Sequence, residues 1–160
     1  MAFDMAIKFE GGNTADGESK SFKDQIDILS WSWGMSNSGT MHTSTGGGAG
    51  KVNVQDLSFT KWVDKASPKL QLACCDGTHY DKATLTCRKA GGKQEDYLVV
   101  EMEEVIVTSV STGGSGGEDR LTENVSINFA KVKLEYSTQD AKGKVAKAGD
   151  YTFNIAENTK

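Results

Sequence analysis

The stretch Asp27–Met35, DILSWSWGM, alternates large apolar residues with small ones. A two-residue period is typical of a β-strand, in which successive side chains point to opposite faces. Just upstream, Ile26 and Ile28 stand at the opposite parity, so the second face begins apolar and becomes small and polar. We expect the odd-numbered residues to face a hydrophobic core and the second face to meet another surface. The odd-numbered residues are Leu29, Trp31, Trp33 and Met35, and the small ones are Ser30, Ser32 and Gly34.

The same alternation recurs along most of the chain and predicts a mainly β protein. The longest such segment, Tyr97–Val110, is apolar at both parities, which indicates a strand covered on both faces. Between Phe129 and Val132 the apolar residues change parity, which predicts a bulge or a strand that serves two surfaces. Further strands are expected within residues 3–9, 52–59, 83–87, 125–136 and 151–155.

One helix is predicted in ASPKLQLACCDG, residues 66–77. Ser67 can cap its start, Pro68 suits its first turn, and Gly77 suits its end. The predicted fold class is therefore mainly β: a single β-barrel or two packed antiparallel sheets, with one short flanking α-helix. No linker or internal repeat divides the sequence, so we expect one domain over residues 1–160.

Composition and charge argue against several classes of protein. The chain has 160 residues and a net charge of −4, and no basic stripe favours nucleic acid. The N-terminus, MAFDMAIKFEG, lacks the basic start and apolar run of a signal peptide. No stretch approaches the roughly 20 apolar residues of a membrane span. We expect a protein that is made in the cytoplasm, binds no nucleic acid and does not insert into a membrane.

The glycine-rich segments do not match a nucleotide-binding motif. In TGGGAGKV, a phosphate-binding loop would need glycine at Thr45 and serine or threonine at Val52. The dinucleotide pattern fails as well, because Lys51 stands where its third glycine belongs. The glycine runs are therefore predicted to be loops, and no cofactor is expected. The Ser36–Gly50 segment is long for a structureless connection, which suggests that it has a role.

Residues that can carry catalysis or bind a metal are few and scattered. The only histidines, His42 and His79, cannot form a usual metal cluster without carboxylates. Glu101 and Glu103 allow a glycosidase pair in principle. On one strand face, however, they are better explained as solvated or paired across an interface, because nothing nearby supplies a second catalytic role.

Two further groups of polar residues need an interpretation. The three cysteines, Cys74, Cys75 and Cys87, are expected to be buried or partly buried free thiols. Residues Glu118–Arg120, EDR, follow a glycine loop and form either surface charge in a turn or an inter-subunit salt bridge.

Four segments together resemble the haemolysin co-regulated protein (Hcp) family. They are SWSWGMS, GGGAGKVNVQDLSFTKWVDKASPKLQLACCDG, ATLTCRKAGG and VSTGGSGGEDRLTENVSINFAKVKLEY, and the resemblance runs from about Phe3 to Ile155. Members of that family form the inner tube of the type VI secretion system, a contractile injection machine related to phage tails. Some members carry a toxic C-terminal domain. This sequence ends at Lys160 directly after its last expected strand, so no effector extension is expected.

The resemblance implies a β-barrel with one flanking helix, assembled as a homo-hexameric ring. It further implies that rings stack into a tube inside a contractile sheath, beneath a spike (VgrG-type) protein, and that effector proteins travel in the lumen. The resemblance also implies a structural protein rather than an enzyme. Such a protein is itself secreted from a Gram-negative bacterium without a signal peptide.

The residue patterns, together with the ring and lumen that the resemblance implies, give candidate contact surfaces. With Trp31 and Trp33 in the barrel core, the small face is expected to line the lumen or a subunit seam and to contact cargo. Cargo candidates are Ser30, Ser32 and Gly34, with Ser32 first. The long loop is expected to touch a neighbouring subunit or the next ring through Thr40, Met41, His42, Thr43, Ser44, Thr45, Gly46, Gly47 and Gly48. Candidate inter-subunit charges are Glu118, Asp119 and Arg120.

Two other classes of function compete with the tube subunit. One is a monomeric, lectin-like β-barrel that grips a small ligand with the Ser36–Gly50 loop. The other is a hydrolase that uses Glu101 or Glu103. Mass in solution separates a ring from a monomeric module, and loss of glycan hydrolysis on Glu103→Gln would support the hydrolase.

Overall fold

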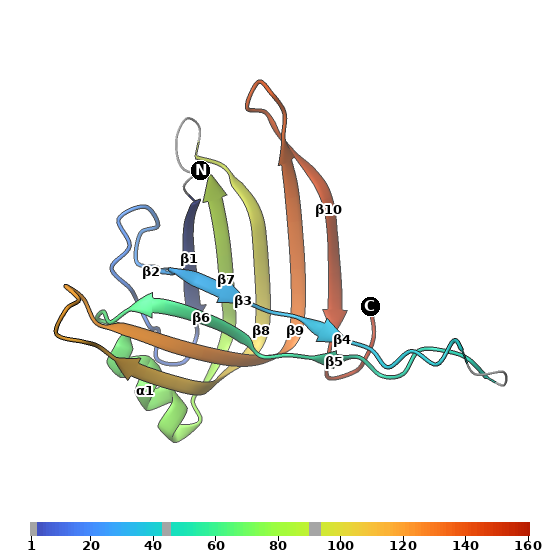
Figure 1. Ribbon diagram of the computed structural model, residues 1–160, viewed down its shortest axis with the longest axis horizontal. Helices are drawn as coiled ribbons and strands as arrows, with labels where there is room; N and C mark the ends of the chain where they lie inside the picture. The colour runs from blue at the N-terminus through green and yellow to red at the C-terminus, as the bar shows by residue number, and fades with distance from the viewer. Residues whose placement is uncertain (1–2, 43–45, 90–93) are drawn as a thin grey trace.

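The computed structural model of the chain describes residues 3–42, 46–89 and 94–160. Within them, antiparallel strands form one curled sheet with a helix at its lower end (Figure 1). This confirms a mainly β fold with one short helix. The strands are β1 Phe3–Glu10, β2 Ile26–Asp27, β3 Ser30–Ser32, β4 Met35–Ser36, β5 Asn53–Val54, β6 Leu57–Trp62, β7 His79–Lys89, β8 Asp96–Gly113, β9 Thr122–Gln139 and β10 Val145–Asn154, and the helix is α1 Ser67–Asp76.

The curled sheet closes on itself within residues 26–32. Its strand order is β2-β1-β7-β8-β9-β6-β3, so the two strands at the ends of the sheet are neighbours in the sequence. The change of partner falls between adjacent residues. The backbone N–H of Ile28 donates to the Met5 carbonyl in β1 (2.9 Å), and that of Leu29 donates to the Thr60 carbonyl in β6 (2.8 Å). Closure of this kind leaves no open edge along this strand order, whereas β10 lies off it and pairs with β9 alone.

This change of partner corrects the faces predicted for the segment. Ile26 and Ile28 are buried in the core, whereas Leu29 and Met35 are 40% and 49% exposed. The prediction of one continuous alternating strand is wrong because the segment contributes to three short strands, β2, β3 and β4. The core-facing parity therefore changes between β2 and β3.

The two long strands β8 and β9 carry the sheet around its bend (Figure 1). The first part of β9 pairs with β6 and the later part pairs with β10, so one strand serves two neighbours. This confirms the predicted change of parity between Phe129 and Val132, which are both buried. In β8, Glu104 adopts a positive φ of 55°, and the register with β9 shifts between Val107 and Ser109.

These irregularities account for much of the two-sided apolar pattern of β8. Val100 and Met102 precede Glu104, and Val105 and Val107 follow it at the opposite parity, yet all four are buried in the same core. A left-handed residue in a strand lets the next side chain return to the face of the previous one. The prediction that β8 is covered on two faces is therefore wrong for these residues.

The helix α1 packs on the core at one end of the sheet (Figure 1). Its own residues Leu70 and Ala73 are buried against the core, and Pro68 lies in its first turn. Gly77 ends it at φ 71°, where its N–H donates to the Ala73 carbonyl (3.0 Å), as its position in the sequence predicts. Ser67 is the first helical residue rather than the cap, and its hydroxyl is used elsewhere.

The strands β4 and β5 form a separate two-stranded sheet at the base of a long arm. Trp31 and Trp33 pack against the barrel core beside it but remain half-buried. The indole N–H of Trp33 donates to the Gln55 carbonyl (2.9 Å), and its ring lies 5.9 Å from that of Phe129. The two tryptophans therefore pack at the periphery of the core rather than among its fully buried residues.

The faces of the closing segment predict losses of stability of different size for two adjacent substitutions. Ile28→Ala should lower the free energy of unfolding by about 2–4 kcal/mol, because it leaves a cavity in the core. Leu29→Ala should cost less than about 1 kcal/mol, since its side chain is largely solvated. Urea unfolding followed by tryptophan fluorescence, at concentrations where light scattering reports single chains, measures both. A larger loss of stability for Leu29→Ala than for Ile28→Ala would contradict these faces and support the core-facing Leu29 predicted from the sequence.

Candidate assembly and cargo surfaces

Two of the three predicted cargo residues lie together on the outer face of the barrel. Ser30 and Ser32 are exposed on β3, while Trp31 between them packs toward the core. β3 pairs with β6, so Ser30 stands opposite Thr60 and Ser32 stands opposite Ser58. The two serines thus belong to a surface of small hydroxyl side chains that continues onto the next strand.

Gly34, the third predicted cargo residue, is less exposed than the two serines. It is half-buried between β3 and β4, and its carbonyl accepts a hydrogen bond from the Gln55 N–H (2.9 Å). A Cβ added at Gly34 would lie 3.2 Å from Oε1 of Gln55. The end of the exposed Gln55 side chain can move aside, so this contact does not by itself require a glycine at position 34.

The Ser36–Gly50 segment is a paired arm that projects from the barrel (Figure 1). Gly39 and Ala49 form an antiparallel bridge, and the Thr40 N–H donates to the Gly48 carbonyl (3.1 Å). Its described residues are thus held by backbone pairing, so the expected loop is an arm that reaches out of its own barrel rather than a structureless connection. An arm held by its own backbone pairing extends away from the barrel, which leaves its surface free for another molecule.

Most residues predicted to make contacts through the arm are exposed. Met41 is 80% exposed near its tip, and Gly48 is the half-buried exception. Thr40, His42, Gly46 and Gly47 are also exposed, whereas Thr43, Ser44 and Thr45 lie outside the described residues.

An apolar groove of about 550 Å³ lies at the base of the arm. Met35, Val52 and Val54 border it from the arm, and Val132 and Phe153 border it from the barrel. Trp33, Tyr151, Thr152 and Lys160 complete the lining. The groove and the exposed Met41 are thus two apolar features on the same projecting element.

The residues Glu118–Arg120 lie exposed in the connection between β8 and β9. The Arg120 guanidinium stacks over the Trp62 ring, 4.7 Å from its centroid. None of the three forms an ion pair with another described residue. Leu121 beside them is 53% exposed, so a charged cluster and an apolar side chain share one surface.

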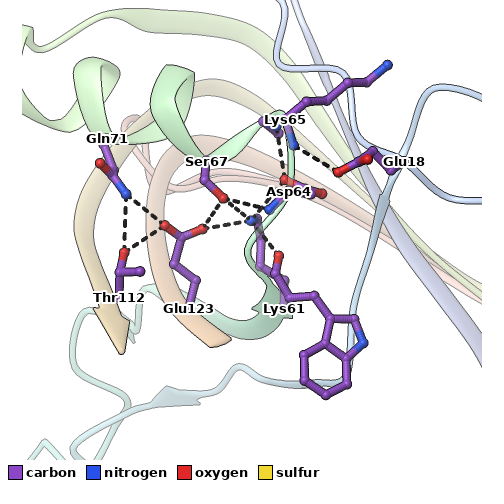
Figure 2. A network of polar contacts seen from close by, with 10 residues as sticks. Glu18, Lys61, Asp64, Lys65, Ser67, Gln71, Thr112 and Glu123 are labelled. Carbon is purple, nitrogen blue, oxygen red and sulfur yellow. Dashed lines mark hydrogen bonds and ion pairs between the residues drawn. The ribbon is translucent and has the colours of Figure 1, made fainter. Parts of the chain in front are cut away.

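A buried ion pair, Lys61–Glu123, lies beneath α1 (Figure 2). The two residues are opposite each other in the β6–β9 register, with 2.7 Å between Nζ and Oε2. Lys61 follows Leu57 and Phe59 at the core-facing parity of β6, and Glu123 precedes Val125 at that of β9. Sequence reasoning missed the pair, although charged residues at core positions of two strands are a signal that can be found.

Glu123 is held in its charged form by four hydrogen bonds. Its Oε2 accepts from Lys61 and from the Ser67 hydroxyl (2.7 Å each), and its Oε1 accepts from Gln71 (2.9 Å) and Thr112 (2.8 Å). Burial alone would raise the pKa of Glu123, but these donors outweigh it and lower the pKa to about 2. The network therefore ties β6, β8, β9 and α1 into one unit.

Lys61 has further acceptors at the start of the helix. Its ammonium donates to the Trp62 carbonyl (2.9 Å) and lies 3.1 Å from Oδ1 of Asp64. The same Oδ1 accepts the Ala66 N–H (2.9 Å), and the Ser67 hydroxyl accepts the Asp64 N–H (3.0 Å). Because every partner is satisfied, the buried charges are tolerated and fix the turn that leads into α1.

The carboxylates considered for catalysis point outward among lysines. Glu101 forms an ion pair with Lys82 (3.3 Å), and Glu103 stands opposite Lys131 and Lys82 in the sheet register. This arrangement is that of a cross-strand charge ladder, which stabilises a solvated sheet face. Pairing with lysines explains these residues without a catalytic role.

The remaining sequence candidates do not gather into a site. The cysteines are free; Cys87 is buried and Cys74 is half-buried, but Cys75 is exposed, contrary to expectation. Among the described residues, no group of three or more histidines, cysteines or carboxylates is arranged to hold a metal ion. Within the same ranges, no helix is both long and apolar enough to cross a membrane.

Comparison with known proteins relates this chain to type VI secretion system proteins. A family model described as "Type VI secretion system effector, Hcp" matches residues 7–136. Protein hcp1 of Pseudomonas aeruginosa (strain PAO1) is 56% identical over 162 residues, which cover 99% of this chain and 98% of that protein. The solved structure of a type six secretion system protein has a TM-score of 0.90 at 32% identity, with 99% of both chains covered. The crystal structure of Hcp1 from Salmonella typhimurium has a TM-score of 0.77 at 35% identity and the same coverage.

The pKa of Glu123 predicts a specific dependence of stability on pH. A folded pKa of about 2, below the ordinary unfolded value near 4.3, means that the unfolded state binds the proton more readily. The contribution of about 3 kcal/mol is therefore present above about pH 4.5 and is lost as pH falls toward about 2.

Urea unfolding of the wild type and Glu123→Gln between these pH values tests this prediction. The variant should be less stable at neutral pH, because it leaves Lys61 short of a buried counter-charge, and the difference should shrink on acidification. Glu101→Gln, at an exposed ion pair, is the matched control and should change little. If the free energy of unfolding of the wild type and of Glu123→Gln changed with pH in the same way, the low pKa of Glu123 would be contradicted.

Proposed function

We propose that this chain, which belongs to the Hcp family of type VI secretion system proteins, is the ring-forming subunit of that system's inner tube. The Hcp family is a structural family of the secretion system and not an enzyme family. The observation that best supports assembly is the arm, because its described residues within 36–50 are nearly all exposed and bury little against their own barrel. A paired element of this length gains its stability most readily from contact with a neighbour.

In this proposal six copies form a closed ring and rings stack end to end. A ring needs contacts between two different surfaces of the same subunit, and such heterologous contacts repeat around an axis. The exposed Glu118–Arg120 segment supplies charges for one side of such a seam. Arg120 is already oriented by Trp62 and has no described carboxylate partner, so it is available to a carboxylate of the next subunit.

The arm joins successive rings in this proposal. Its tip carries the exposed Met41 and its base carries the apolar groove, so a tip on one copy can pack at the base of another. When the arm tip of one copy packs at the arm base of another, the two copies still have one free tip and one free base. Further copies can therefore add at both ends, and the assembly grows along a line. Methionine suits such a contact because its flexible side chain adapts to an irregular apolar surface.

The outward serines of β3 then face the lumen and contact effector proteins. Ser32 is the leading candidate and Ser30 lies near it on β3. Both side chains are exposed on the face of the strand away from Trp31. Gly34 belongs to this proposal only as the small residue that follows them. We further propose that the single tube domain of residues 1–160 is made in the cytoplasm and secreted without a signal peptide, and that its partners are the spike protein and the contractile sheath.

The ring is tested by mass in solution. Light scattering of the purified chain should give about six times the subunit mass of 17.2 kDa, and electron microscopy should show closed rings. The competing lectin-like module predicts the mass of one chain. A single-chain mass at micromolar concentration would therefore reject the tube subunit.

The arm is tested by deletion of residues 43–48. The shortened chain should still fold and form rings, because none of the described residues of the arm belongs to the barrel core, but ring stacking and secretion should fall severalfold. Replacing the same six residues with a glycine–serine sequence of equal length is the matched control for length. Normal secretion by the deletion variant would make the arm a passive connection.

A further inference from the structure

The arm carries the two most exposed methionines of the described chain. Met41, near the tip, is 80% exposed, and Met35, at the base, is 49% exposed. By contrast, Met102 is fully buried in the core and Met5 is half-buried against it. The thioethers that are most open to solvent therefore lie at the two ends of one projecting element, and the barrel protects the other two.

The positions of these methionines bear on the contact proposed for the arm. Met41 lies at the tip, and Met35 helps to line the apolar groove of about 550 Å³ at the base. When a tip packs in the groove of another copy, the Met41 side chain leaves water and contacts the groove lining. That contact requires an apolar side chain at position 41, because a polar group that is buried without a hydrogen bond is costly.

The groove offers few hydrogen-bond donors to a polar side chain. The indole N–H of Trp33 is part of the lining, but it already donates to the Gln55 carbonyl (2.9 Å). Otherwise the polar side chains of the lining belong to Tyr151, Thr152 and Lys160, among valines, a methionine and a phenylalanine. An oxygen atom added to the arm tip would therefore exchange water for a surface that is mostly hydrocarbon.

We infer that Met41 is an oxidation site through which peroxides control the stacking of rings. This rests on the proposed function, in which the arm joins successive rings. In the reaction with hydrogen peroxide, the O–O bond breaks, one oxygen atom bonds to the Met41 sulfur, and the other leaves as water. The sulfur loses two electrons and the peroxide gains them. The product, methionine sulfoxide, is polar where the thioether was apolar.

The oxidation acts on rings that have not yet stacked. In the proposed tube the tip is covered by the next ring, whereas on a single ring Met41 is open to solvent. Peroxide therefore lowers the supply of rings that can stack and leaves the barrel intact, since Met102 is enclosed in the core. The change is reversible, because methionine sulfoxide reductases return the sulfoxide to the thioether, with thiols as the source of electrons.

Peroxide treatment of purified rings tests this inference. All chains that are compared carry Cys75→Ser, because Cys75 is an exposed thiol and peroxide also oxidises thiols. Peptide mass spectrometry should find the sulfoxide at Met41 before Met35, and none at Met102. The fraction of rings in stacks, counted by electron microscopy, should then fall at least about tenfold. The ring mass from light scattering should not change.

Substitutions at position 41 separate oxidation from loss of the side chain. Met41→Leu keeps an apolar side chain of similar volume that peroxide does not oxidise, so stacking should stay within about twofold after treatment. Met41→Gln introduces an uncharged polar side chain and should prevent stacking without peroxide. Met35→Leu is the matched control at the other exposed methionine, and its rings should remain as sensitive as the wild type. Methionine sulfoxide reductase with dithiothreitol should restore the stacking of oxidised wild-type rings.

The possible results separate a failure of this inference from a failure of the proposed function. If the untreated chain forms no rings, or if its rings never stack, the proposed function is rejected and the control by Met41 is rejected with it. If rings that carry the Met41 sulfoxide stack as well as untreated rings, the inference alone is wrong. Equal losses of stacking for the wild type and Met41→Leu would assign the sensitivity to another residue and would also overturn the inference.

Discussion

The barrel depends on one pair of adjacent backbone hydrogen bonds. Ile28 bonds to β1 and Leu29 bonds to β6, so one short segment joins the two ends of the sheet. The other strands along this closed order then present one side to the core and the other to an outer surface. The segment satisfies this constraint by changing its core-facing parity, which puts Ile28 inside and leaves Leu29 largely exposed.

The ion pair under α1 has a different part in the fold. Burying two charges costs several kcal/mol for each ion, and their attraction offsets that cost only when the geometry is good and other donors and acceptors are satisfied. Glu123 meets this condition through Lys61, Ser67, Gln71 and Thr112. Compared with apolar residues of similar volume the pair gains little stability, although removing the charge of Glu123 alone is costly, and any shift of the helix would break several bonds at once. The pair specifies where α1 sits on the closed sheet.

The outer surface of the sheet is divided by chemistry. Lysine and glutamate alternate across β7, β8 and β9, whereas hydroxyl and amide side chains cover β3, β6 and the adjoining parts of β8 and β9. A tube subunit has two such needs. Its solvated side must keep the protein soluble, and its lumen side must let cargo leave. In the proposed tube, charged rows would serve the first need, and small neutral groups would serve the second because they bind weakly.

The sequence by itself determined the mainly β class, the end of the helix at Gly77 and the change of parity in β9, because each rests on local periodicity or on a residue with special backbone freedom. Its resemblance to a known family also pointed to the secretion tube. Only the tertiary structure decided the partner of each strand. A two-residue period does not specify which strand accepts the hydrogen bond of a given N–H group. The change of partner strand between Ile28 and Leu29 therefore could not be predicted. The Lys61–Glu123 pair joins residues that are far apart in the chain. The outward hydroxyl side chains of β3, β6, β8 and β9 are likewise far apart in the chain, and only the register of the sheet brings them together.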